Sequence, residues 1–223
     1  MPCCYHMRPE KVFDAARKDR YLAPASISAL QMRRPGNVMS DSGSKEEFAP
    51  AGPWAADPVH STVFFEIVHA GVSTFRGAFK EFSATLTGGK NASLEGTAKV
   101  ASVDVTEEHL NGHLQTPDFF DAERYPEITF KATELRRLEN NLVGGSGDLT
   151  IKGVTRPITL EGAIASAPAT DPFGRERLGL RLETTIDRND YGVSWNKPNQ
   201  SGGNYLADEV KLVAELALVR AEA

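Results

Sequence analysis

The chain has 223 residues, of which 40% are hydrophobic and 25% are charged, and this composition is that of an ordinary globular protein. Its formal net charge of −5 argues against a nucleic-acid partner, and the lack of any apolar run near the ~18 residues that span a bilayer argues against integral membrane association. The two cysteines, Cys3 and Cys4, are neighbours, so the chain after them is excluded from forming an internal disulfide or a cysteine-based metal site.

Residues 1–50 are predicted to form a disordered or weakly structured extension, followed by one domain over residues 51–223. In residues 1–38, seven basic and three acidic side chains give a net charge of +4 and leave −9 on the rest. The apolar stretch at residues 21–30 is interrupted by proline and serine, so it does not form the ~7 to 15-residue core of a secretory signal. We therefore expect a cytoplasmic protein, with Met39 as a second candidate start.

From residue 61 the pattern becomes that of β-strands. Residues 61–69 alternate in polarity, and Glu66 marks one face as the solvent side. Val63, Phe65 and Ile67 on the other face are therefore expected to point inward.

The next strand carries Phe75, Gly77 and Phe79 on one face, and Phe82 resumes the apolar series three positions later. This offset predicts a bulge near residues 80–81. Gly77 lies between large apolar neighbours, where a glycine lets a sheet bend or a ligand approach.

A helix over residues 106–120 is expected to cover one end of the sheet. Thr106 is the predicted N-cap, and Leu110 and Leu114, four residues apart, share one face. Phe119 and Phe120 are the expected apolar anchors of this segment.

Further strands are predicted at residues 93–105, 127–136, 142–151, 158–166, 177–186 and 210–220. In the later strands, Leu180, Leu182 and Leu212 belong to apolar faces that alternate with polar ones, an alternation broken mainly by Val213, Ala217 and Val219. About eight such strands with short turns indicate an all-β, antiparallel, closed barrel. A β-sandwich is the alternative architecture.

Five sequence blocks, in order, resemble the YceI-like family of lipid- and polyisoprenoid-binding proteins. One of them, GDLTIKGVTRPITL at residues 147–160, also reads as a hairpin with a break over residues 153–157, where Gly153 supplies a positive φ. The resemblance implies a lipocalin-like barrel around an apolar cavity that holds an isoprenoid or similar chain. The other four blocks occupy residues 57–79, 113–130, 186–192 and 206–216.

The resulting hypothesis is a protein without catalytic activity that carries or sequesters a polyisoprenoid, an isoprenoid quinone, a polyprenyl phosphate or another lipid. Two alternatives stay open: a hydrolase or isomerase acting inside the barrel, and a stress-related structural barrel with a filled core and no ligand. A homodimer is also left open. The predicted ligand-binding residues are Val63, Phe65, Ile67, His69, Phe75, Arg76, Phe79, Phe82, Phe119, Phe120, Leu180, Leu182 and Leu212.

Within that set, His69 and Arg76 flank a turn and are candidates for contacting a polar head group, since arginine suits a phosphate. The alternative is a hydrogen-bonded hairpin with a surface arginine. His109 and His113 have the spacing of two metal ligands on one helix face, but an exposed polar face explains them better. No nucleophile motif or nucleotide-binding loop is present, so no catalytic residue, metal or cofactor is predicted.

Overall fold

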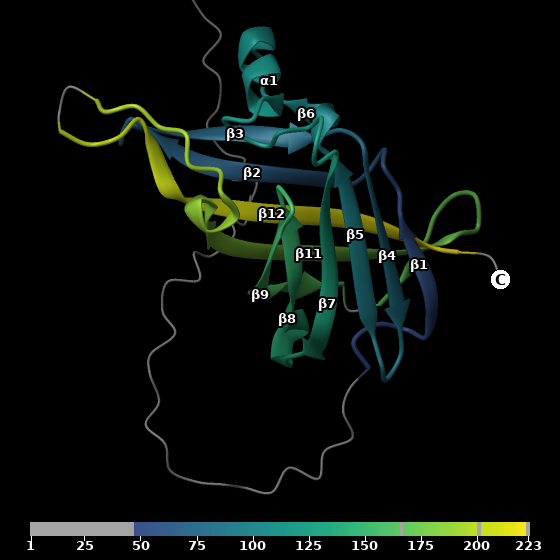
Figure 1. The fold of residues 1–223 in the computed structure, drawn as a ribbon. Coiled ribbons are helices and arrows are strands. Elements are labelled where there is room, and N and C mark those ends of the chain that lie inside the picture. Colours follow the sequence, from purple (N-terminus) through teal and green to yellow (C-terminus); the bar gives the residue numbers. More distant parts are fainter. Residues whose placement is uncertain (1–46, 166, 200–201, 222–223) are drawn as a thin grey trace, which may run out of the picture. The chain divides into compact units, whose positions relative to one another are not determined.

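The computed structural model describes residues 47–165, 167–199 and 202–221. Within these residues, antiparallel pairings join eight strands into a closed circuit, in the order β1, β4, β5, β7, β8, β9, β11, β12 and back to β1 (Figure 1). The predicted barrel is therefore confirmed, and the sandwich alternative is wrong. The strands are β1 (Gly52–Ala56), β2 (Thr62–His69), β3 (Ser73–Phe79), β4 (Phe82–Gly88), β5 (Ser93–Lys99), β6 (Val103–Asp104), β7 (Glu127–Arg137), β8 (Leu142–Ile151), β9 (Val154–Ile164), β10 (Ala169–Thr170), β11 (Glu176–Asp187) and β12 (Leu206–Arg220).

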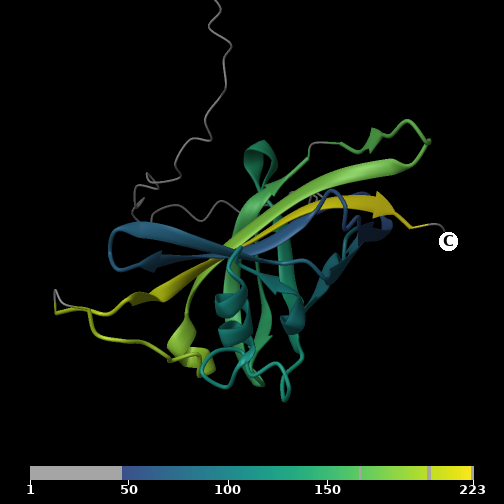
Figure 2. The same cartoon turned by 90° about the horizontal axis from the view of Figure 1, so that it is seen from above.

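β2 and β3 complete the barrel beside this circuit. β12 pairs with β1 near its carboxyl end and with β2 along the rest of its length. β3 pairs with β2, and β4, which follows it, pairs with β1. The break between β3 and β4 falls at residues 80–81, where the apolar pattern predicts a bulge. Figure 2 shows the two longest strands, β11 and β12, running side by side across the molecule.

The predicted N-terminal extension lies outside the described residues up to residue 46. Phe48 and Ala49, which that prediction places in the extension, are buried beside Trp54 and Leu86. None of the helices in the described ranges is long and apolar enough to cross a membrane.

The segment 147–160 forms a hairpin with a shorter turn than its sequence suggests. The predicted break over residues 153–157 is wrong, because the turn consists of Lys152 and Gly153 alone. Both have positive φ, 50° and 74°, the two-residue geometry that matches strand twist. Pro157 is accommodated inside β9 because β9 pairs with β11 only near its carboxyl end, so the missing N–H removes no pairing on that side.

The predicted continuous strand at residues 93–105 is interrupted. β5 ends at Lys99, a short 3₁₀ helix η1 (Val100–Ser102) follows, and β6 pairs with β3 instead of continuing along β4. The interruption accompanies the break between β3 and β4, since β5 pairs with β4 and β6 pairs with β3. Two further 3₁₀ helices are η2 (Glu139–Asn141) and η3 (Arg188–Tyr191).

The one α-helix of the described chain, α1 (Glu108–Gln115), is shorter than predicted. Its N-cap is Glu107, whose carboxylate accepts hydrogen bonds from the backbone N–H groups of His109 and Leu110. The predicted N-cap, Thr106, is wrong, since it has a positive φ of 68° and precedes the helix. Figure 1 shows α1 beside β6 and β3, where it covers one end of the barrel as predicted.

The interior divides into two apolar clusters along the barrel axis. The first lies at the end covered by α1, here called the helix end, and contains Phe65, Phe79 and Leu114. The second lies at the opposite end and is centred on Trp54, Leu86 and Leu218, each 0% exposed. We call this the Trp54 end. The side chains of this second cluster fill the Trp54 end of the barrel.

Candidate functional site

A cavity of about 750 Å³ occupies the barrel lumen, within the size range of small-molecule sites. Its wall is formed mainly by the inward face of the strands, together with α1 and the segment around Trp195. Several inward residues remain only half-buried although they lie inside a closed sheet, among them Val63, Phe82, Phe130 and Leu212. The barrel is therefore hollow, which the sequence alone leaves undecided.

Three phenylalanines form an aromatic cluster in the cavity wall. The ring centroids of Phe65 and Phe79 are 6.0 Å apart, and those of Phe65 and Phe120 are 6.3 Å apart. Phe79 and Phe120 complete the triangle at 5.9 Å in an edge-to-face arrangement. Such pairs hold their rings in fixed relative orientations, so this part of the wall has a defined shape.

A second aromatic group stands at the helix end. The imidazole of His113 lies edge-to-face against Phe119 and against Trp195, with centroids 5.0 Å apart in both pairs. Its Nε2 is 2.9 Å from Oδ2 of Asp118. His113 thus belongs to the cavity wall, whereas His109 is exposed.

The segment that carries Trp195 is held by one buried arginine. Arg188, only 5% exposed, donates hydrogen bonds to the backbone carbonyls of Val193, Trp195 and Ala207. Its Nη2 is 3.2 Å from Oδ1 of Asp208. Arg188 therefore joins η3 to both ends of the loop that closes one side of the cavity.

Tyr191 lies in the same wall and is 2% exposed. Burial raises the pKa of its hydroxyl, and the nearby charge of Asp190 adds to this effect. Among the buried side-chain polar atoms of the described residues, the Tyr191 hydroxyl alone has no hydrogen-bond partner. It is a neutral donor and acceptor inside an apolar wall.

The cavity reaches the surface between the β2–β3 hairpin and the start of β12. The lining there includes His69 and Tyr205, whose rings are 5.7 Å apart and both exposed. The hydroxyls of Ser73 and Thr74 stand at the same rim. This opening is therefore more polar than the interior.

All predicted site residues except Arg76 and Leu180 line this cavity. Leu180 is buried in the cluster at the Trp54 end. Arg76 lies on the outer face, where its guanidinium pairs with Glu66 on the neighbouring strand and stands 4.6 Å above the ring of Phe64. Because alternate strand residues face opposite sides, Arg76 points away from the lumen that Phe75 faces.

Several lining residues are missing from the predicted set. Strand alternation would have found those of β8 and β9, since they continue the apolar faces already recognised. Tyr191, Trp195 and Tyr205 lie in a 3₁₀ helix and a loop without periodicity, so no sequence pattern points to them. The lining strand residues not predicted include Leu94, Ile128, Phe130, Leu149, Ile151, Ile158, Leu160, Val210, Ala214 and Leu216.

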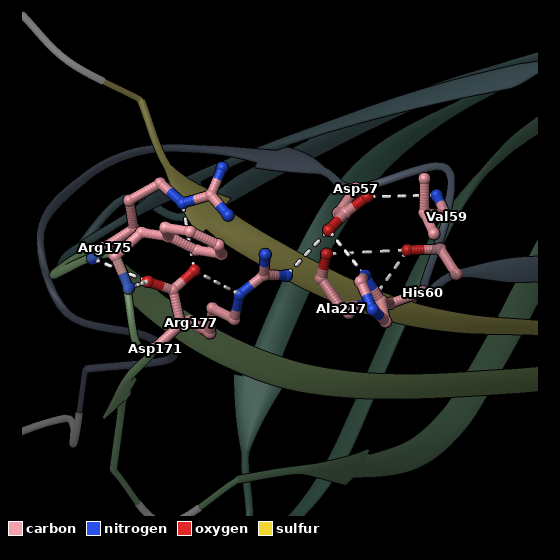
Figure 3. A network of polar contacts seen from close by, with 9 residues as sticks. Asp57, Val59, His60, Asp171, Arg175, Arg177 and Ala217 are labelled. Atoms are coloured by element: carbon pink, nitrogen blue, oxygen red, sulfur yellow. Dashed lines mark hydrogen bonds and ion pairs between the residues drawn. The ribbon is translucent and has the colours of Figure 1, made fainter.

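A polar network closes the outside of the Trp54 end (Figure 3). Arg177 bridges Asp57, at 2.7 Å, and Asp171, at 2.9 Å. Hydrogen bonds from Arg177 and then from His60 hold the pKa of Asp57 well below its usual range. Burial acts to raise the pKa of Asp171, but hydrogen bonds from the Arg175 backbone and the Arg177 side chain bring it well below the usual range. This network joins the β1–β2 connection to the β10–β11 hairpin and is structural.

In the described part of the chain, no group of three or more histidine, cysteine, aspartate or glutamate side chains is placed to hold a metal ion. The pair of His113 and Asp118 therefore lacks the further ligands that a metal ion would need in this part of the chain. What the cavity offers chemically is apolar contact area with a polar rim.

Comparison with known proteins supports a specific family. The sequence profile of the YceI-like domain matches residues 54–218. A UPF0312 protein of Staphylococcus epidermidis is 36% identical over 162 residues, which cover 71% of this chain and 92% of that protein.

Solved structures share the architecture. BcnA of Burkholderia cenocepacia is 26% identical, with a TM-score of 0.63 over 74% of this chain and 99% of that chain. A polyisoprenoid binding domain from Saccharophagus degradans, implicated in plant cell wall breakdown, is 17% identical, with a TM-score of 0.56 over 76% of this chain and 98% of that chain. At that identity the second likeness shows the fold alone.

Proposed function

This chain belongs to the YceI-like family, and on that premise we propose that it binds a long apolar molecule in its lumen and carries or sequesters it. The observation that carries the proposal is the cavity of about 750 Å³ with its apolar wall. We place an isoprenoid first among the ligand classes, because a protein of the same fold is described as a polyisoprenoid binding domain.

Apolar burial is sufficient to drive such binding. Each CH₂ group moved from water into an apolar wall contributes about 0.8 kcal/mol, and a long tail has many of them. Ordering the tail and losing its free motion oppose binding by several kcal/mol. A preformed cavity reduces that opposing term on the protein side, because the barrel strands are already fixed.

The wall supports an uncharged head group better than a phosphate. Among the described lining residues the guanidinium of Arg188 already donates to three carbonyls and contacts Asp208, and no lysine lines the cavity. Arg76 pairs with Glu66 on the outer face. A phosphate would lack a dedicated cation, so an isoprenoid quinone or alcohol is the better match.

The direct test is organic extraction of the purified protein followed by mass spectrometry. The expected result is a long-chain lipid in stoichiometric amount. A variant with a blocked lumen, Leu212→Trp, should lose that lipid while keeping its unfolding midpoint. Thr185→Trp places the same ring on the exposed face of β11 and should retain it. Lipid-free protein that also fails to take up added prenyl alcohol would overturn the proposal.

An enzyme is the second candidate, and one observation favours it. His113 lines the cavity, and its Nε2 lies 2.9 Å from Oδ2 of Asp118. A histidine oriented by a carboxylate is a common general base. The same ring is packed edge-to-face between two aromatics, which equally explains it as part of the wall. Conversion of an added prenyl ester, abolished by His113→Gln, would establish the enzyme.

A further inference from the structure

The cavity ends inside the barrel, before it reaches the packed side chains of the Trp54 end. On β12, Leu216 lines the cavity but Leu218 does not, and on β11 the boundary falls between Leu182 and Leu180. On β4 it falls immediately after Ala84. The lining residues at this end of the cavity, here called the floor, are Ala84, Leu94, Gly96, Phe130, Leu160, Leu182 and Leu216.

The floor rests on fully packed side chains. Trp54 and Leu86 are paired across β1 and β4, and each is 0% exposed. The Trp54 indole donates a hydrogen bond to the carbonyl of Pro50 at 2.9 Å, and the guanidinium of Arg220 lies 4.2 Å from the ring centroid. Close-packed interiors yield little to an incoming group, so the cavity is blind and rigid at the Trp54 end.

We propose that this floor sets the maximum tail length that the protein accepts. The inference rests on the proposed function and adds a specificity determinant to it. A tail enters from the rim near His69 and Tyr205, because that end of the cavity is exposed. Its last carbons stop at the floor. Longer tails must leave carbons at the rim in water, and those carbons contribute no burial energy.

Gly96 allows the floor to be raised without disturbing the sheet. It lies between the inward residues Leu94 and Ala98 on β5, and a Cβ atom there would meet its nearest neighbours at 3.6 Å and 4.0 Å, which is ordinary contact. The replacement series Gly96→Ala, Gly96→Val and Gly96→Leu therefore extends into the cavity step by step. Ala84→Leu raises the same floor from the paired position on β4.

Gly179 provides the matched control. It is exposed on β11, outside the barrel, and a Cβ atom there would meet only the Cβ of Ala165 at 3.9 Å. Gly179→Leu therefore adds the same side chain to a barrel strand without entering the lumen. The affinity and unfolding midpoint of Gly179→Leu therefore show how an added leucine in a barrel strand acts when it does not enter the lumen.

The experiment measures the affinity of the full chain for farnesol, geranylgeraniol and solanesol, three prenyl alcohols of increasing length, with the unfolding midpoint of each variant. Gly96→Leu and Ala84→Leu should each weaken binding of the longest alcohol that the unaltered protein accepts by about ten-fold or more, the loss expected when two or more CH₂ groups find no room. Farnesol binding should change by less than about two-fold, and Gly179→Leu should behave as the unaltered protein.

The outcomes separate the two proposals. If the unaltered protein binds none of the three alcohols, the proposed function fails. If it binds them but the Gly96 series weakens all lengths equally, or none, the floor does not select for length. Should Gly96→Leu fail to fold, Gly96→Val and Ala84→Leu still decide, because either must shift the length preference in the same direction.

Discussion

The ring of Phe65 occupies the space above Gly77 on the neighbouring strand, so closely that a Cβ atom on Gly77 would lie 2.4 Å from Cζ of Phe65. Gly147 is crowded in a similar way by the diagonal neighbour Phe130, whose ring would lie 2.4 Å from a Cβ atom at this position. Both phenylalanines line the cavity. Glycine at these two strand positions therefore lets large rings lie flat against the wall and leaves the lumen open.

We expect Gly77→Ala to lower the free energy of unfolding by about 1–3 kcal/mol, as overpacking does in a close-packed interior. The new methyl would also meet Cγ1 of Val105 at 2.7 Å, so the Phe65 ring has little room to retreat. Chemical denaturation measures the loss. Gly96→Ala is the control, since its methyl has ordinary contacts, and it should be neutral or slightly stabilising. Equal effects from the two substitutions would contradict the steric explanation.

Combining Gly77→Ala with Phe65→Leu tests the contact directly. If the ring is the obstacle, the double variant should be more stable than the sum of the two single losses predicts. Simple additivity would mean that the two positions act independently.

Arg188→Met should destabilise the barrel by about 1–3 kcal/mol or more, because a buried carbonyl left without its hydrogen-bond donor costs on that order. The carbonyls of Val193, Trp195 and Ala207 would lose their donor. Hydrogen exchange should accelerate first in residues 193–199 and 202–207. Arg181→Met is the comparison: Arg181 is 44% exposed and pairs with Glu183 and Glu215, and exposed pairs contribute about 0–1 kcal/mol. Similar losses from both arginines would refute the anchoring role.

Acid should weaken the Trp54 end through the network of Figure 3. The pKa values of Asp57 and Asp171 are held below the ordinary 3.8 in the folded protein, so the unfolded chain takes up these protons first as the pH falls. The stability that the network contributes is therefore complete above about pH 4 and is lost progressively below it. Urea unfolding midpoints measured from pH 6 downward should show the decline.

The variant Asp171→Asn removes one of the two titrating groups. It should lower stability at neutral pH and flatten the decline below about pH 4. Asp118→Asn, at the helix end, removes a carboxylate that is 55% exposed, and it should leave the slope nearly unchanged. An acid slope that persists in full in Asp171→Asn would show that other carboxylates govern it.

The barrel is predictable from the sequence because apolar and polar residues alternate along most of its strands. Parity alone places Phe65, Phe79 and Leu182 in the wall, since a strand has only two faces. The prediction that Arg76 contacts a ligand head group is wrong for a related reason. It rests on the nearness of Arg76 to the turn, whereas the parity of Arg76 matches that of Glu66 across the strand pair.

What the sequence did not reveal depends on three-dimensional closure. Tyr191, in η3, and Trp195, in the following loop, both reach the wall. Arg188 holds that loop through hydrogen bonds to the carbonyls of Val193 and Trp195, and no local sequence pattern predicts these bonds. The sequence also does not predict that the barrel is hollow. The volume of a lumen depends on how far opposite walls stand apart, which alternation along one strand does not specify.

The hydroxyl of Tyr191 offers a last test, because it is buried without a partner. A buried polar group that lacks a hydrogen bond costs about 1–3 kcal/mol, so Tyr191→Phe should raise the free energy of unfolding by about 1 kcal/mol in lipid-free protein. Tyr205→Phe is the control, since Tyr205 is 40% exposed and its hydroxyl reaches water, and it should change stability by less than about 0.5 kcal/mol. Thermal and urea unfolding of the two variants give the comparison. A loss of stability in Tyr191→Phe would mean that the hydroxyl has a partner in solution, such as an ordered water in the wall.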